Sequence, residues 1–564
     1  MGLKAAWNVC EMLLDSKDRK LHPHGVKLQT RLEFRRVPVT IQMFGDAMNL
    51  LAESQFDIQG PVQAQEIFQT LKDLYALGYD HLRPNEVIYN TCIKACGKTG
   101  TVEGAKRAEE LLEEMKREGI EPSIRGYQGV MRAWSATGSP ESGERAQYWM
   151  DEIKKHGWKP NAFTYAPLIH SWTMSLEGEA AAKKASDLIE ELTKLQKEEN
   201  DPSLSPTTTL YNLLILAMMK GEEVDIGVRA EGVLKKMWHQ HYTSGVATCK
   251  PTPVTYGHVM QAWIKSGHAD RMKNIERLLL EIWKRYDDGD RSLAPGCFCY
   301  SSMIRALIKN GGENAGEKAE AVLRTMWERF SKGRKSDLRI RPDSSVYGDV
   351  LEAWAVSNHP QAGENAMRIL KEMRRKPGGE KDPNVKPRTT RICYNAVLDA
   401  WSKSHSPMAA NHAQHLLCDM WDIYYRTDKE TRNKPNHYSY RRVLAALAVS
   451  PDEDAPDRAE RLVQEMWELY ERGENKFTPS TLCYNYVLEA WSNSNHPDAG
   501  FRIDAVLDDM KELSEDETLE NAICPNINSY THVIKAHEKL GNGQRVKDLM
   551  AEQLKLTEQP ELEP

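Results

Sequence analysis

The chain has 564 residues and a formal net charge of −7; 40% of its residues are hydrophobic and 28% are charged. This length is too great for one ordinary core, so several domains or a repeat array are expected, and no apolar run approaches the roughly 20 residues of a membrane span. The net charge excludes a global polycation of the kind that announces nucleic-acid binding, and ten scattered cysteines without a CxxC pair exclude a zinc ribbon or a disulfide scaffold.

The N-terminal segment is predicted to be the second half of a repeat that recurs later. AAWNVCEM at residues 5–12 matches AERLVQEM at residues 459–466, with the same spacing of Ala and Met. We therefore expect residues 1–37 to form a partial repeat, which consists of one helix and its exit loop. The segment lacks the apolar core of a secretory signal and carries acidic residues early, unlike an organellar presequence.

From residue 44 onward, one aromatic position recurs through the chain at intervals of 38 to 47 residues. A fixed period of this length is typical of solenoids and other repeat architectures. We call the recurring residue the anchor. The anchors are Phe44, Tyr89, Tyr127, Tyr165, Tyr211, Tyr256, Tyr300, Tyr347, Tyr394, Tyr440, Tyr484 and Tyr530.

Apolar residues follow each anchor at fixed distances, as the repeat of Tyr394 illustrates. Ala400 and Trp401 stand six and seven residues after the anchor, and Ala413 and Met420 follow nineteen and twenty-six residues after it. Such spacings place the apolar side chains on one stripe of a helix. Each repeat is therefore predicted to begin with a helix near the anchor, to continue through a turn, and to end with a second helix.

Turn and proline signals agree with these boundaries. Segments such as SNHPQAGE, between the two predicted helices, are rich in Gly, Pro, Asn and Ser, and a proline lies five residues before almost every anchor, where a helix begins. One helical pair cannot bury its own apolar stripe, so the pairs must stack. The sequence predicts an all-α fold, a right-handed α-solenoid superhelix of about twelve helix-turn-helix repeats, with tandem repeats over residues 38–529 and a C-terminal capping repeat and polar tail over residues 530–564.

Two recurring features invite a catalytic reading and are better explained by packing. CYNAVLDAWSKS at residues 393–404 returns as CYNYVLEAWSNS at residues 483–494, two repeats later. The position of Cys393 and Cys483 accepts Thr, Val or Ser in other repeats, so it requires a small side chain rather than a nucleophile. The tryptophans are locked to the repeat period and are expected to pack between repeats. No catalytic constellation, metal set or cofactor motif stands out, so we expect a protein without enzymatic activity.

One unit carries the features of a known family. NEVIYNTCIKACGKTGTVEGAKRAEELLEEMKREGIEPS, residues 85–123, resembles the pentatricopeptide repeat. The resemblance is carried by Tyr89, Asn90, Ile93, Gly100, Ala108, Leu112, Met115, Gly119 and Pro122. Most units of this chain are 44–47 residues long, as in extended variants of the repeat.

The resemblance implies a superhelix whose first helices line the inner groove and bind single-stranded RNA, one nucleotide per repeat. It also implies a mitochondrion or plastid as the site of action, and a role in RNA processing, stability or translation beside other organellar RNA-processing proteins. It implies no cofactor, no small-molecule substrate and no membrane partner. Physically, two or three side chains per repeat suffice to sandwich one base and read its edge.

The resemblance also implies which residues contact the base. In the family, the residue after the anchor and the last residue of the same unit read the base edge, and the residue two before the anchor sandwiches the base. The implied reading pairs are Asn90 with Ser123, Gln128 with Asn161, Asn212 with Thr252, Ser301 with Asp343, Asn395 with Asn436, and Asn485 with Asn526. The implied sandwich residues are Phe163, Phe298 and Tyr438. By the family code, Asn with Ser or Asn favours pyrimidines, and Ser with Asp leans to guanine.

Six repeats depart from this pattern. Their first reading residue is Gly45, Gln128, Ala166, Gly257, Gly348 or Arg441. Gly and Ala cannot form a hydrogen bond to a base edge with a side chain, so readout is expected to be sparse. The net negative charge points the same way, since neutralising phosphates requires Lys or Arg. A helical-repeat scaffold for protein–protein interaction is therefore the alternative function.

Overall fold

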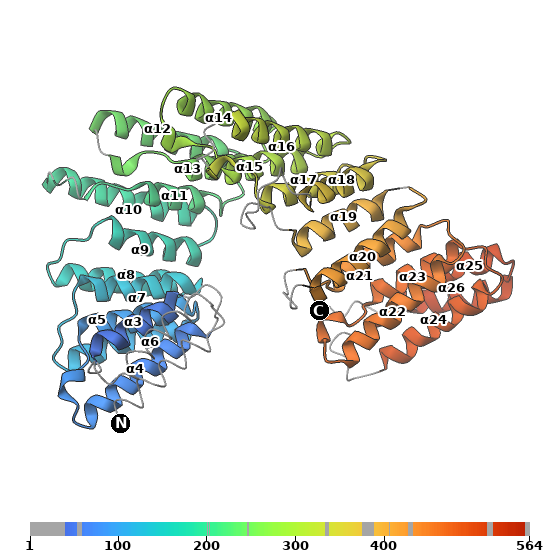
Figure 1. Ribbon diagram of the computed structural model, residues 1–564, viewed down its shortest axis with the longest axis horizontal. Coiled ribbons are helices and arrows are strands. Elements are labelled where there is room, and N and C mark those ends of the chain that lie inside the picture. The colour runs from blue at the N-terminus through green and yellow to red at the C-terminus, as the bar shows by residue number, and fades with distance from the viewer. Residues whose placement is uncertain are drawn as a thin grey trace. The chain divides into compact units, whose positions relative to one another are not determined.

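The computed structural model describes residues 40–53, 59–199, 201, 204–244, 247–332, 338–374, 389–404, 406–426, 433–515 and 523–558. In this part of the chain the regular structure is helical, with 24 α-helices and a few short 3₁₀ turns (Figure 1). The α-helices form twelve pairs, one for each anchor, which confirms the expected all-α solenoid. The partial repeat expected for residues 1–37 lies outside the described residues.

We call the first helix of each pair helix A and the second helix B. The helices A are α3 (Ile41–Glu53), α5 (Glu86–Lys98), α7 (Ile124–Thr137), α9 (Ala162–Ser175), α11 (Thr208–Met218), α13 (Pro253–Ser266), α15 (Cys297–Asn310), α17 (Ser344–Val356), α19 (Arg391–Lys403), α21 (His437–Ala448), α23 (Thr481–Asn493) and α25 (Ile527–Lys539). The helices B are α4 (Gly60–Ala76), α6 (Val102–Arg117), α8 (Ser142–Lys155), α10 (Gly178–Glu199), α12 (Ile226–Ser244), α14 (Arg271–Asp287), α16 (Ala315–Lys332), α18 (Ala362–Arg374), α20 (Ala409–Arg426), α22 (Ala455–Glu471), α24 (Ala499–Ser514) and α26 (Gly543–Glu558).

The segments between one repeat and the next contain the 3₁₀ turns. These turns are η1 (Asp80–Leu82), η3 (Ala247–Cys249), η4 (Arg291–Leu293), η5 (Leu338–Ile340) and η7 (Asn475–Phe477). Each follows a helix B and precedes the next helix A, so the longer repeats take up their extra residues here. No helix in the described ranges is long and apolar enough to cross a membrane.

The chain divides into two compact units, Met1–Leu278 and Leu279–Pro564. Within each unit, successive helices A pack against one another, as α5 with α7 and α17 with α19. A helix B packs against the helix A of its own repeat and that of the next, as α20 does with α19 and α21. The helices A of each unit therefore form a continuous layer.

The anchors form the core between repeats. Tyr347 and Tyr440 are buried, and each hydroxyl accepts a hydrogen bond from a tryptophan on the preceding helix B, Trp327 Nε1 at 3.0 Å and Trp421 Nε1 at 2.9 Å. Burial raises the pKa of Tyr347 to about 12, so its hydroxyl stays protonated. The same bond joins Trp238 to Tyr256, Trp283 to Tyr300, and Trp467 to Tyr484.

The tryptophans of helix A pack against the helix B of the preceding repeat. Trp401 is almost fully buried and lies against Gly363, the second residue of the preceding helix B, where a Cβ would come within 3.0 Å of the indole. The pairs Gly143 with Trp172, Gly227 with Trp263, and Gly316 with Trp354 repeat this contact. These contacts confirm that the period-locked tryptophans pack between repeats.

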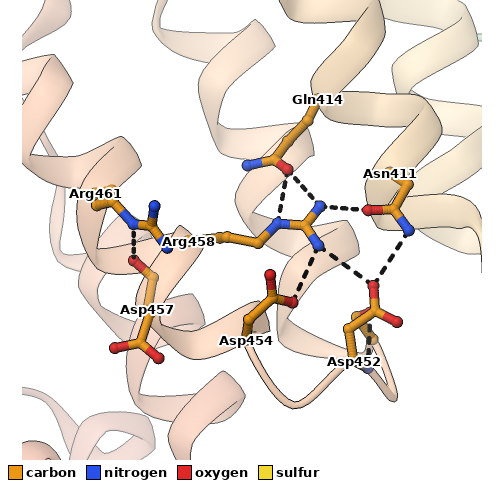
Figure 2. Close-up of polar contacts among 8 residues, drawn as sticks. Asn411, Gln414, Asp452, Asp454, Asp457, Arg458 and Arg461 are labelled. Carbon is orange, nitrogen blue, oxygen red and sulfur yellow. Dashed lines mark hydrogen bonds and ion pairs between the residues drawn. The ribbon is translucent and has the colours of Figure 1, made fainter.

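Polar contacts also join neighbouring helices B. Arg458 on α22 donates to Gln414 Oε1 at 2.8 Å and to Asn411 Oδ1 at 2.7 Å, both on α20 (Figure 2). Its remaining nitrogen lies 3.3 Å from the carboxylates of Asp452 and Asp454 in the turn before α22. The Arg458 guanidinium thus bonds to the first turns of α20 and to the turn between α21 and α22.

Candidate nucleic-acid interface

Three positions at the N-terminal halves of the helices A recur in the same register. The sandwich position lies two residues before the anchor, and the reading position lies one residue after it. The cap position, the last residue of a unit, lies four residues before the next anchor. It is the N-cap of the next helix A, as Asn436 is for α21 and Asn526 for α25. Because successive helices A are in contact, the reading position of one repeat comes close to the cap position that follows it.

The structure brings Asn395 and Asn436 together, as the resemblance implies. Asn395 Nδ2 donates to Asn436 Oδ1 at 3.4 Å, and Asn395 Oδ1 accepts from the hydroxyl of Ser439 at 2.7 Å. Asn436 Oδ1 also accepts from the backbone nitrogen of Ser439 at 3.2 Å, which closes a capping box at the start of α21. Both asparagine side chains are therefore held in place by hydrogen bonds at the N-terminal end of α21.

The same network recurs two repeats later. Asn485 Nδ2 donates to Asn526 Oδ1 at 3.2 Å, and Asn485 Oδ1 accepts from the hydroxyl of Ser529 at 2.6 Å. Asn485 is buried and Asn526 is exposed. Two of the six expected pairs are thus joined directly.

These networks leave hydrogen-bonding groups free. A primary amide offers two N–H donors and an oxygen with two lone pairs. Asn395 uses one donor and one lone pair in its network, and the Nδ2 group of Asn436 takes no part in it. The pair serves as a helix cap and still presents donors that a base edge can use.

Two further pairs are joined through a third residue. Gln128 is buried, and its Nε2 donates to Thr164 Oγ1 at 2.9 Å, which lies 3.4 Å from Asn161 Oδ1. Glu86 Oε1 accepts from Asn90 Nδ2 and from the backbone nitrogen of Ser123, both at 3.3 Å. The mediators, Thr164 and Glu86, are not reading residues in the family pattern.

The remaining two pairs share no hydrogen bond within the described residues. Thr252 caps α13 through Thr255, and Asp343 caps α17 by accepting from the backbone nitrogens of its first turn. The reading residue Asn212 has a buried Oδ1 with no hydrogen-bond partner among the described residues. The two residues of each pair thus occupy the expected repeat positions, but no hydrogen bond joins them within the described residues.

The sandwich position is exposed and apolar in several repeats. Phe163 on α9 is 73% exposed and Ile392 on α19 is 72% exposed. Large apolar side chains at this position are also exposed in three other repeats, Val87, Val254 and Leu482. Single exposed apolar residues are normal, but these five recur in one register and form a row of apolar surface, with three on the helix A layer of the first unit and two on that of the second.

The other two expected sandwich residues are less open. Phe298 is half-buried on α15. Tyr438 is half-buried on α21, where the guanidinium groups of Arg441 and Arg442 lie 4.9 Å and 4.6 Å from the centre of its ring. Of the three expected aromatics, Phe163 therefore presents the most open face.

Sequence comparisons identify the repeat. The PPR repeat family matches residues 84–135, and the pentatricopeptide repeat domain matches residues 110–173. The matches fall on the units of Tyr89, Tyr127 and Tyr165, which have the same register of anchor, cap and reading positions as the rest of the chain. The units of Tyr89 and Tyr127 are the shortest, at 38 residues each. Residues 84–173 therefore carry pentatricopeptide repeats.

Solved pentatricopeptide repeat proteins are similar over most of the chain. The crystal structure of PPR10 from maize is 17% identical, with 94% of this chain and 71% of that chain covered, at a TM-score of 0.39. PPR10 in complex with an 18-nt psaJ RNA element is 16% identical, with 99% and 82% covered, also at 0.39. No curated protein matches the sequence.

The structure adds residues that the sequence argument missed. That argument looked for aromatic side chains at the sandwich position of the pentatricopeptide repeat, whereas exposed aliphatic residues fill it more often. At the same position of α7 stands Arg125, an exposed cation, and Arg132 lies two turns further along the same face. Neither side chain has an ion pair or hydrogen bond to any described residue. Position relative to the anchor, rather than residue type, was the signal that could have found them.

Two other arginines of the helix A layer are paired. Arg305 on α15 lies 3.1 Å from Asp349 on α17, and Arg442 on α21 lies 2.9 Å from Asp399 on α19. Each pair joins adjacent helices A. Burial raises the pKa of Asp349. These arginines are neutralised within the protein, which lowers the positive charge of the layer around them.

Proposed function

We propose that this pentatricopeptide repeat protein binds single-stranded RNA along the helix A layer, with bases held between successive sandwich positions. One observation carries the proposal: the row of exposed apolar side chains at Val87, Phe163, Val254, Ile392 and Leu482. Every base has a planar apolar face, so a periodic row of such side chains suits a strand whose bases are splayed out and stacked. The match of residues 84–173 to pentatricopeptide repeats supports the same ligand.

The finer parts of the proposal concern readout and setting. One base per repeat is proposed, with the amide pairs Asn395/Asn436 and Asn485/Asn526 as the best-ordered readers. The binding surface is proposed to run along the tandem repeats of residues 38–529, which the repeat of residues 530–564 caps. The proposed role is that of a non-catalytic adaptor in RNA processing, stability or translation in a mitochondrion or plastid.

Stacking provides the first test. Phe163→Ala removes the most exposed aromatic of the row, and we expect the dissociation constant for single-stranded RNA to rise roughly five- to a hundredfold, since stacking contributes about 1–3 kcal/mol per base. Phe501→Ala is the matched control, because Phe501 is equally exposed (77%) but lies on helix B α24. Filter binding with random single-stranded RNA measures both. Equal effects of the two variants would contradict the proposed surface.

Base readout provides a second test. Selection from a random RNA pool should enrich pyrimidine-containing single strands, and Asn395→Ala combined with Asn485→Ala should abolish the pyrimidine preference at two positions. The selection is run at low and high salt, because phosphate contacts weaken as salt rises. If the protein retains no RNA even at low salt, the RNA-binding proposal is wrong.

A protein-binding scaffold is the second candidate. It is favoured by the ion pairs Arg305–Asp349 and Arg442–Asp399, which neutralise cations that phosphates would otherwise attract. The same low-salt experiment separates the two functions. Failure to retain RNA, with the fold intact by circular dichroism, would leave the scaffold as the better interpretation.

A further inference from the structure

Arg441 occupies the reading position of α21, between two repeats that carry asparagine there. The preceding repeat has Asn395 and the following repeat has Asn485, each paired with the asparagine at its cap position. Arginine at the reading position is not one of the residues that favour pyrimidines or guanine in the family code described above. Its surroundings decide what it does.

The neighbour that would hold the reading side chain differs in this repeat. Ser439 and Ser529 hold Asn395 and Asn485 through their hydroxyl groups, whereas Cys483 stands at the equivalent place for Arg441. Its sulfur lies 3.6 Å from His437 Nε2 and 3.5 Å from Ser480 Oγ. Burial raises the pKa of the Cys483 thiol, so it carries no charge for Arg441 to pair with.

The two neighbouring arginines of α21 therefore differ in their polar contacts. The Arg442 guanidinium is bound to Asp399 at 2.9 Å and donates to the Tyr438 hydroxyl at 2.7 Å. For Arg441, the described residues supply no ion pair and no hydrogen bond to the side chain. Its guanidinium rests 4.9 Å from the centre of the Tyr438 ring, at the sandwich position of the same repeat.

The chemistry of this side chain limits its ligand. A guanidinium has five N–H donors in a fixed plane and no acceptor. Guanine presents two adjacent acceptors, O6 and N7, which suit a bidentate contact with arginine. On this same edge, adenine places an amino donor beside N7 and cytosine presents an amino donor, so a guanidinium that reads this edge meets a donor in both bases. Uracil offers no such adjacent pair of acceptors.

We propose that Arg441 reads a guanine, so that the repeats of Tyr394, Tyr440 and Tyr484 together select a pyrimidine–guanine–pyrimidine triplet. The proposal rests on the proposed binding of single-stranded RNA. Tyr438 and the exposed Leu482 of the next repeat flank the guanine at the two sandwich positions. The pattern is symmetric, so it holds for either direction of the strand along the repeats.

The test compares four proteins in selection from a random single-stranded RNA pool. These are the wild type, Arg441→Gln, Arg441→Asn, and the control Arg461→Gln. Arg461 is an exposed arginine on helix B α22 whose Nε donates to the carbonyl of Asp457 (Figure 2), so the control removes the same charge from another face of the same repeat. Dissociation constants are then measured for the selected RNA and for its versions with A, C or U at the central base.

The wild type and Arg461→Gln should enrich guanine between two pyrimidines and bind the other three bases roughly five- to a hundredfold more weakly. Arg441→Gln should lose this preference and keep the flanking pyrimidines. Arg441→Asn should replace guanine by a pyrimidine, as in the flanking repeats. Circular dichroism checks that each variant is folded.

Two results would overturn the inference while RNA binding stands. One is a wild type that binds RNA without preferring guanine at the centre. The other is an Arg441→Gln that weakens all four central bases equally and reduces the salt dependence, which is the behaviour of a phosphate contact. Absence of binding to any RNA would instead overturn the proposed function itself.

Discussion

At the scale of single residues, the tryptophan of one repeat restricts the second residue of helix B in the repeat before it. Gly363 faces Trp401, and a Cβ there would lie within 3.0 Å of this buried indole. Gly348 on helix A α17 has nothing within 4 Å of the place where its Cβ would stand. The first glycine is required by packing and the second is not.

Gly363→Ala should therefore destabilise the junction between α18 and α19 by about 1–3 kcal/mol, the usual cost of overpacking. Gly348→Ala, the matched control, should be neutral or stabilising by up to about 1 kcal/mol, because alanine favours a helix. Hydrogen exchange of the two junctions measures both effects locally, which suits a repeat array that need not unfold in one step. A Gly363→Ala protein with unchanged protection would contradict the packing argument.

Asp349 makes folding depend on pH. Burial raises the pKa of its carboxyl above the unfolded value, although Arg305 lies 3.1 Å away. The folded state thus binds this proton more tightly, and the stability that results is complete below the unfolded pKa and is lost as the pH rises through the folded pKa. Asp349→Asn keeps an acceptor for Arg305 but cannot ionise. The wild type should lose stability as Asp349 ionises, and the variant should not. The difference between the melting temperature of the variant and that of the wild type should therefore be larger at about pH 7 than at about pH 4. A difference that is the same at both pH values would refute this.

At the scale of elements, the C-terminal ends of helices A are capped by the next repeat. The last carbonyls of a helix lack partners within it. Lys403 Nζ donates to the carbonyl of Ala355 at 3.0 Å, Asn493 Nδ2 to that of Ala448 at 2.9 Å, and Lys539 Nζ to that of Ser492 at 2.6 Å. Each donor stands nine residues after its anchor, so this capping is a property of the repeat.

Lys403→Ala should loosen the last turn of α17 by about 0.5–1.5 kcal/mol, the net contribution of one hydrogen bond. Lys318→Ala, on helix B α16, removes an exposed lysine whose side chain forms no hydrogen bond or ion pair to the described residues, and it should have no such effect. Hydrogen exchange at the C-terminal turn of α17 is the measurement. Faster exchange in both variants would point to a general charge effect instead of a cap.

At the scale of the whole molecule, the repeat period was enough to predict the twelve helical pairs, because apolar residues such as Ala, Trp and Met recur at the same spacings from most anchors. The proximity of Asn395 to Asn436 followed from the family register. The sequence could not predict that Arg442 is paired and Arg441 is not, because this depends on Asp399 and Cys483, each more than forty residues away along the chain. It also did not indicate which sandwich residues are exposed, since exposure is decided by neighbouring repeats.

The balance of charge over the chain sets how salt affects binding. A net charge of −7, with Arg305 and Arg442 neutralised, leaves Arg125 and Arg132 as the arginines of α7 open to phosphates. Each phosphate contact with a single strand contributes about −0.7 to the slope of log K against log salt, so two contacts give about −1.4.

Arg125→Gln combined with Arg132→Gln should bring the slope close to zero in a salt titration of RNA binding. Arg426→Gln combined with Arg461→Gln removes two exposed arginines from helices B and should leave the slope unchanged. A steep slope that persists in the first double variant would mean that phosphates are bound elsewhere than on α7. A shallow slope confined to that variant would place the electrostatic part of binding in the repeat of Tyr127 and leave the recognition of bases to the apolar row and the amide pairs.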